Sequence, residues 1–160
     1  MIVNRQRRVS ITLRPLDEFC ESVRRELQFP DEGVVVCLIS DPAIARLNRT
    51  FRGKHGPTDV LSFPAVPDKP HVTSHSAGKG AAGHRPRRGK FTDPTYVGDI
   101  AISPETARRN ARRFSRALTT ELRILILHGM IHLAGYDHET DDGQMERFER
   151  RLRRRFGLKT

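Results

Sequence analysis

The sequence predicts an α+β fold: one domain in which a small mixed β-sheet packs against helices. Short strand-like runs and longer stretches of helical periodicity follow one another along the 160 residues. One run, VVVCLIS at residues 34–40, is continuously apolar, as a buried central strand would be. A chain of this length can bury the core of a single domain, so we expect residues 1–160 to form one.

The first half of the chain shows alternation, helical spacing and turn residues in succession. Apolar positions recur at helical spacing after Pro15. Asp41 and Pro42 form the cap and first position of another helix, which Gly53 closes. The expected elements are a strand at 9–15, a helix at 16–27, a strand at 34–40, a helix at 41–51 and a strand at 60–63.

The second half is expected to be one strand followed by three helices. Ser103 and Pro104 form a helix start after the strand YVGDIAIS. One of the helices is apolar nearly all round and should therefore be buried. The expected elements are a strand at 96–103, a helix from 104 to about 118, the buried helix at 120–134 and an arginine-rich helix at 141–156. The order is β-α-β-α-β-β-α-α-α.

Residues 65–95 differ from the rest of the chain. They are rich in Gly, Pro, His, Lys and Arg and lack apolar periodicity, which predicts a flexible basic insertion between two strands. A second metal site at His71, His75 and His84 is disfavoured because no regular scaffold underlies their spacing. An arm that touches RNA and a passive loop both remain open for this segment.

The composition bears on location and partners. No apolar run reaches the roughly 20 residues that cross a bilayer, and the N-terminus has no apolar signal region, so we expect a cytoplasmic protein without membrane contact. Cys20 and Cys37 are expected as small buried hydrophobes rather than a disulfide. The 29 Lys and Arg against 19 Asp and Glu give a net charge of +10. Nucleic acid is the leading partner class, with a basic solvated surface as the alternative.

The stretch HGMIHLAGYDH, at residues 128–138, predicts a metal site on the buried helix. His128 and His132 are four residues apart, so both imidazoles project from one helix face and can share a cation. Gly135 lets the chain turn sharply, so that His138 can return as a third ligand. Zinc is favoured for three neutral imidazoles, one ion per chain, although nickel, copper and iron also fit the ligand type.

Three neutral ligands leave the metal an open position, which is typical of a catalytic rather than a structural zinc site. Water bound there is activated near neutral pH. A zinc protease of this spacing carries its catalytic glutamate directly after the first histidine, where this chain has Gly129. The missing carboxylate and the basic charge together favour a phosphodiester substrate over a peptide.

Three stretches resemble the YbeY family of bacterial endoribonucleases that mature ribosomal RNA. They are the histidine motif, LNRTFRGKHGPTDVLSFP at residues 47–64 and VGDIAIS at residues 97–103. The resemblance implies a zinc-dependent endoribonuclease specific for single strands. Its implied work is maturation of the 3′ end of 16S ribosomal RNA and ribosome quality control, with the small ribosomal subunit or its associated proteins as partners and no DNA.

The resemblance also assigns roles to particular residues. By motif position, His128, His132 and His138 correspond to the metal ligands, and His128 is also implicated in catalysis. Arg52 corresponds to a residue important for activity, as a phosphate or transition-state contact. The long 65–95 insertion is the main departure from the family pattern.

Several alternatives remain open from the residues alone. A zinc peptidase would need Glu121 or Glu139 as its base, and a non-catalytic ribosome-assembly factor would use the metal for stability only. Asp137 is a candidate to orient a ligand histidine or to stabilise the turn. Tyr136 can stack on a base or fill the core. The arginines of 147–155 can follow an RNA backbone or simply solvate their helix. Asp59 is expected to make a local turn bond.

Overall fold

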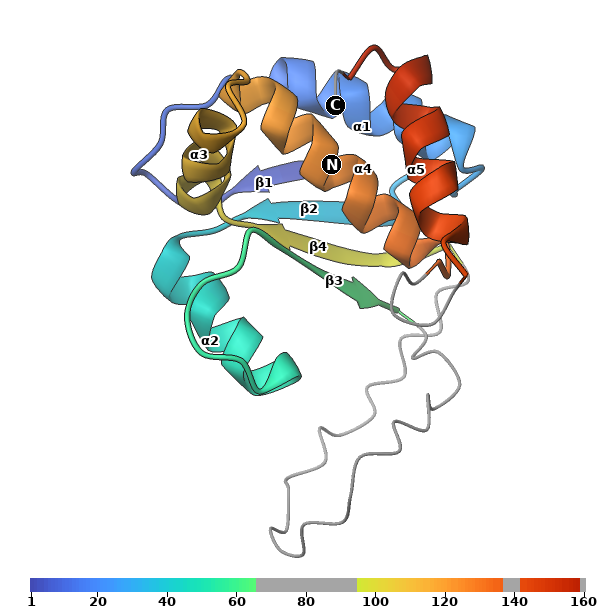
Figure 1. Cartoon of the computed structure of the whole chain (residues 1–160). Coiled ribbons are helices and arrows are strands. Elements are labelled where there is room, and N and C mark those ends of the chain that lie inside the picture. Colours follow the sequence, from blue (N-terminus) through green and yellow to red (C-terminus); the bar gives the residue numbers. More distant parts are fainter. Residues whose placement is uncertain (66–94, 137–141, 159–160) are drawn as a thin grey trace, which may run out of the picture.

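A four-stranded mixed β-sheet forms the centre of the protein in the computed structural model, which describes residues 1–65, 95–136 and 142–158 (Figure 1). The strands lie in the order β1-β2-β4-β3. β1 and β4 run parallel to the central β2, and the edge strand β3 runs antiparallel to β4. The strands are β1 (Ile2–Asn4), β2 (Val34–Leu38), β3 (Val60–Pro64) and β4 (Gly98–Ile102).

Helices cover the two faces of the sheet unequally. α1, α4 and α5 lie above one face, α2 lies below the other, and α3 stands at one end (Figure 1). The helices are α1 (Arg14–Glu26), α2 (Asp41–Arg52), α3 (Pro104–Arg113), α4 (Leu118–Leu133) and α5 (Gln144–Arg155). None of the described helices is both long and apolar enough to span a membrane.

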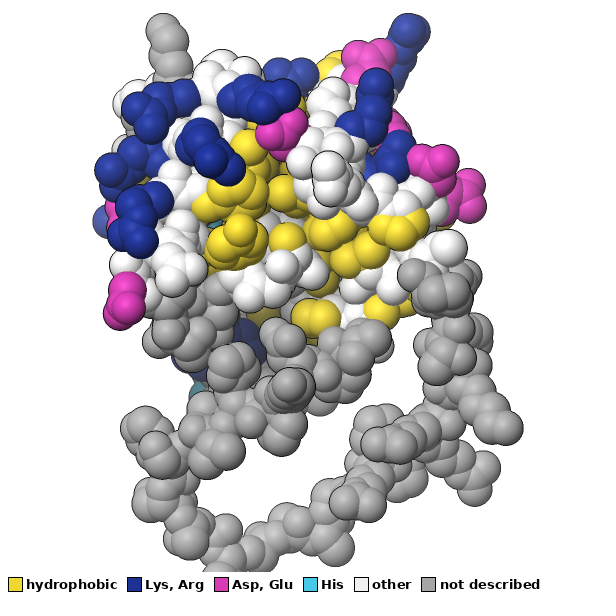
Figure 2. Space-filling view, turned by 90° about the vertical axis from the view of Figure 1, so that its right-hand side faces the viewer, with side chains coloured by type: hydrophobic (Ala, Val, Ile, Leu, Met, Phe, Trp, Pro, Cys, Tyr) yellow, Lys and Arg dark blue, Asp and Glu magenta, His cyan; other side chains and the backbone are white. Residues whose placement is uncertain are grey.

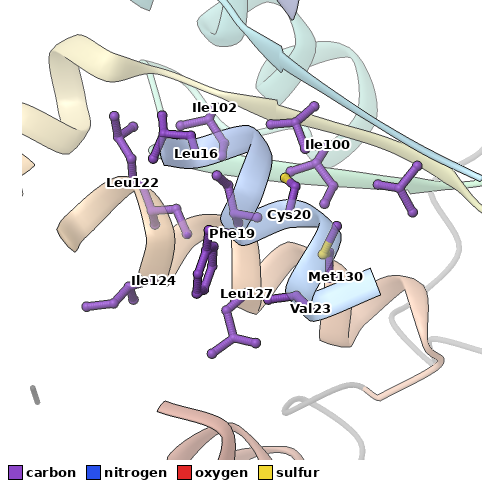
Figure 3. Close-up of a cluster of buried hydrophobic side chains, with 14 of the residues drawn as sticks. Leu16, Phe19, Cys20, Val23, Ile100, Ile102, Leu122, Ile124, Leu127 and Met130 are labelled. Carbon is purple, nitrogen blue, oxygen red and sulfur yellow. The ribbon is translucent and has the colours of Figure 1, made fainter. Parts of the chain in front are cut away.

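The main core lies between the sheet and the helices α1 and α4. Val36 and Leu38 of β2 are fully buried on this face, whereas Cys37 between them is only partly buried on the other, as strand alternation requires. Leu16 and Phe19 of α1 lie in one buried cluster with Leu122 of α4 and Ile102 of β4 (Figure 3). α4 is buried along most of its length, which explains why it is apolar nearly all round.

The structure confirms the predicted α+β class and the order of elements, but the first strand was placed wrongly. β1 is Ile2–Asn4, and residues 9–13 form no strand. The buried Gln6 side chain satisfies this segment instead: its Oε1 accepts hydrogen bonds from the backbone N–H groups of Arg8 and Val9, and its Nε2 donates to the Val9 carbonyl. The N–H and C=O groups of Val9, at the start of this segment, therefore need no sheet partner.

The start of α2 also differs in detail from the prediction. Ser40, not Asp41, is the residue before the first helical turn, and Asp41 is the first helical residue. The Asp41 carboxylate accepts hydrogen bonds from Thr106 and Arg109 of α3, at 2.8 Å each, so it joins two helices rather than capping one. Gly53 closes α2 with a positive φ of 64°, as expected. The insertion expected at about 65–95 lies outside the described residues except at its two ends.

Candidate metal centre

Two histidines project from the partly exposed side of α4. His128 and His132 are half-buried, whereas Leu127, Met130 and Ile131 around them are buried in the core. The two Nε2 atoms lie 3.1 Å apart, and the rings meet edge to face with centroids 4.7 Å apart. The i, i+4 spacing therefore places both imidazole nitrogens at one point, as predicted.

Gly129 lies on the opposite side of α4, where the helix approaches the sheet. A Cβ atom at this position would lie 2.8 Å from Cγ2 of Ile100 on β4 and 3.2 Å from Oγ of Ser62 on β3. The Ser62 hydroxyl donates a 3.3 Å hydrogen bond to the Gly129 carbonyl. A side chain at this position therefore requires Ile100, Ser62 or α4 to shift. Close packing against the sheet thus explains why a glycine stands where a zinc protease has its catalytic glutamate, and the site lacks that carboxylate as a consequence.

Glu149 of α5 contacts His128 at Nδ1, the ring nitrogen that does not face His132. Its Oε2 lies 3.1 Å from Nδ1 of His128, and its Oε1 accepts a 3.0 Å hydrogen bond from Nε of Arg153. Burial would raise the pKa of Glu149, but the hydrogen bonds and positive charge of His128 and Arg153 lower it overall. An ionised carboxylate here accepts a hydrogen bond from Nδ1–H, which selects the neutral tautomer whose Nε2 lone pair can bind a metal.

Sequence reasoning did not single out Glu149, which interrupts a run of arginines on its helix. The sequence does indicate an ion pair between Glu149 and Arg153, because residues four apart on a helix are neighbours. The contact between α5 and His128 spans 21 residues of sequence and depends on how the two helices pack. Only the folded chain shows this contact.

The histidine pair fits a zinc ion. Two nitrogens bound at 2.0–2.1 Å with tetrahedral geometry stand about 3.3 Å apart, which is close to the separation of the two Nε2 atoms. Glu149 supplies the carboxylate that metal-bound histidines commonly use as a partner for the other ring nitrogen. The predicted third ligand, His138, lies outside the described residues. Within the described ranges no three metal-ligating side chains converge.

A cavity of about 320 Å³ opens beside His128. Asp59, Asn110, Arg116, Glu121 and Arg153 are among its polar lining residues. It is therefore a polar, mixed-charge cavity next to the imidazole, large enough for part of a charged substrate to enter.

Glu121 is the most deeply buried charged group of this cavity, with 4% of its surface exposed. Burial raises its pKa, and the guanidinium of Arg116, 3.4 Å from Oε2, offsets only part of that effect. Oε2 has no hydrogen-bond partner among the described residues, because the Arg116 contact lacks hydrogen-bond geometry. Glu121 lies two turns before His128, yet both side chains line one cavity.

The other predicted residues lie in different places. Arg52 is exposed in the last turn of α2, which covers the opposite face of the sheet from α4, and it is not among the described residues that line the His128 cavity. Asp59 makes the expected local bond, accepting from the N–H of Val60 at 2.9 Å. Tyr136 stacks on Phe148 of α5. Asp137 and Glu139 lie outside the described residues.

Comparisons with known proteins place this chain in a family. The model of the family described as Endoribonuclease YbeY matches residues 1–157. An endoribonuclease YbeY of Geobacter sulfurreducens is 34% identical, over 98% of this chain and 93% of its own. One of Solibacter usitatus is 38% identical, over 96% of this chain and 87% of its own.

A solved structure agrees with these sequence matches. The solution structure of TM1509 from Thermotoga maritima is similar with a TM-score of 0.56 and 28% identity, covering 98% of this chain and 90% of that one. The sequence relatives are matched almost from end to end. The chain therefore belongs to the Endoribonuclease YbeY family.

Proposed function

We propose that the protein is an endoribonuclease that cleaves single-stranded RNA in the processing of ribosomal RNA, using one zinc ion held by His128, His132 and His138. Membership of the Endoribonuclease YbeY family supports the activity and RNA as the substrate. The observation that carries the metal part is the pair of Nε2 atoms 3.1 Å apart, one of them on an imidazole whose other nitrogen is held by Glu149.

The chain's own residues prepare this site for a phosphodiester. Glu149 orients the His128 ring through Nδ1 so that its Nε2 faces that of His132, and Arg153 holds Glu149 in place. The cavity beside His128 admits the substrate next to the imidazole. When bound, zinc would supply positive charge that activates water and polarises a phosphoryl oxygen. Arg52 is proposed to contact the scissile phosphate from the end of α2.

We place this activity in the cytoplasm, at the 3′ end of small-subunit ribosomal RNA and in ribosome quality control. The net charge of +10 supports an RNA partner, because basic side chains release counterions when they neutralise phosphates. Gly129 supports a phosphodiester over a peptide, because no carboxylate follows the first histidine and the packing of α4 leaves no room for one.

The test is cleavage of a labelled single-stranded RNA by zinc-loaded protein, with and without chelator. The duplex form of the RNA and a single-stranded DNA of the same sequence serve as substrate controls. Arg52→Ala is compared with Arg49→Ala, an exposed arginine of the same helix. Cleavage of single-stranded RNA alone, lost on chelation and in Arg52→Ala but kept in Arg49→Ala, is the expected result.

Other outcomes separate the alternatives. RNA left intact by a folded, zinc-loaded protein would indicate a ribosome-assembly factor without catalysis. Digestion of casein at the same zinc loading, lost in Glu121→Gln, would indicate a peptidase, which is worth testing because Glu121 lines the cavity of His128. The RNA termini report the attacking group, since a 2′,3′-cyclic phosphate would exclude attack by water.

A further inference from the structure

We propose that one face of α5, together with Tyr136, is a second contact site for single-stranded RNA next to the histidine pair. This α5 surface consists of Tyr136, Arg147, Phe148, Arg150, Arg151 and Arg154, which line a hollow of about 540 Å³. Arginines hold the phosphates there and an unpaired base joins an existing aromatic stack. The choice of RNA as occupant rests on the proposed function.

The arginines of the α5 surface follow one line along the helix. Arg147, Arg150, Arg151 and Arg154 stand at positions i, i+3, i+4 and i+7, so they share one face, and all four are exposed. Seven residues of helix rise about 10 Å, which is about three stacked nucleotides at 3.4 Å each. A guanidinium can pair with phosphate oxygens through two parallel hydrogen bonds.

An aromatic stack lies at the centre of this line. Phe148 stacks on Tyr136, with ring centroids 4.8 Å apart and planes 22° from parallel. The guanidinium of Arg151 lies 4.9 Å from the centroid of the Phe148 ring. Bases of single-stranded RNA stack on aromatic rings and on arginine planes alike. A base can therefore extend this stack or, as Arg151 turns to a phosphate, take its place on Phe148.

The charge of the hollow is suited to a polyanion. Neither aspartate nor glutamate is among the described residues that line it. The helix has two glutamates: Glu149 is turned to His128 and Arg153, and Glu146 forms an exposed ion pair with Arg150. An ion pair this exposed contributes little and gives way readily to a phosphate. Figure 2 shows lysine and arginine side chains gathered on this side of the molecule, beside exposed hydrophobic side chains.

α5 links this surface to the candidate metal centre. Glu149 contacts His128, and the neighbouring residue Phe148 lines the hollow. One face of α5 therefore contacts the candidate metal centre and an adjacent face forms the α5 surface. Tyr136 follows His132 by four residues, just after α4 ends at Leu133. RNA that lies along α5 is thereby kept within a few nucleotides of the histidines. An acidic protein segment would also be drawn to the arginines but would make no use of the aromatic stack.

Binding without cleavage tests the α5 surface by itself. Fluorescence anisotropy of a short labelled single-stranded RNA is measured in chelator at several salt concentrations. The variant Arg150→Gln/Arg154→Gln is compared with Arg108→Gln/Arg112→Gln, which removes two exposed arginines at the same spacing from α3. We expect the α5 pair to raise the Kd about tenfold or more and to reduce the slope of log K against log salt by about 1.4. The α3 pair should leave the slope nearly unchanged.

A second variant separates stacking from charge. Phe148→Leu should raise the Kd at least about fivefold while leaving the salt slope at the wild-type value, because stacking releases no counterions. A wild-type Kd in both α5 variants, or equal competition by polyglutamate and RNA, would overturn the proposal. If the α5 variants lose RNA binding but the wild-type protein cuts no RNA, the proposed function is refuted and the α5 surface stands. If the wild-type protein cuts RNA and the α5 variants have an unchanged KM, the α5 surface is refuted and the proposed function stands.

Discussion

Replacing Gly129 tests whether close packing between α4 and the sheet excludes a side chain beside the first histidine. In Gly129→Ala, the new Cβ would lie 2.8 Å from Cγ2 of Ile100, a fully buried side chain whose branching at Cβ restricts its rotamers. Overpacking of this kind costs about 1–3 kcal/mol, and alanine regains about 1 kcal/mol of helix propensity. We expect the free energy of unfolding to fall by about 1 kcal/mol.

Gly129→Glu restores the order of residues found in a zinc protease and should be far worse. It adds a larger volume and a buried carboxylate without a partner, each costing a few kcal/mol, so we expect a loss of about 4 kcal/mol or more. Urea unfolding measures both variants, with Thr119→Glu, exposed on the same helix, as the control. If alanine instead stabilises the protein by its full propensity, α4 is not crowded against β4 and the packing argument is wrong.

Three further predictions concern ionisable groups. Glu149→Gln should weaken zinc affinity about 10–100-fold, because His128 loses its carboxylate partner; competition with a chromogenic chelator measures it, and an unchanged affinity would contradict the contact. Burial raises the pKa of Glu121, so the folded state keeps this proton to a higher pH than the unfolded state, and the free energy of unfolding falls as pH rises above the ordinary value of 4.5. Urea titrations at several pH values should show that Glu121→Gln removes this fall. Identical pH profiles for the variant and the wild-type protein would show that the pKa is not raised. Burial raises the pKa of Cys20 to about 12, so a thiol reagent should modify the less buried Cys37 first, and the reverse order would place Cys20 nearer the surface.

The sequence alone determined the helices, three of the four strands and the meeting of His128 with His132. These features follow from local periodicity, since apolar spacing defines a buried helix face and residues four apart share one side of a helix. The turn signals were equally local: Gly53 ends α2 because glycine adopts a positive φ readily, and Ser103 caps α3 through its hydroxyl. Such contacts need only a few neighbouring residues to form.

The tertiary structure decided what depends on residues distant in the sequence. Residues 9–15 alternate like a strand, but the strand that pairs with β2 is Ile2–Asn4, and the Gln6 side chain binds the backbone of Val9 at the start of the later segment. Glu149 acquires its role only where α5 packs beside His128. The packing reason for Gly129 appears only where α4 approaches Ile100 of β4. Alternation and helical spacing describe one helix or strand at a time, whereas steric fit depends on two elements that pack together.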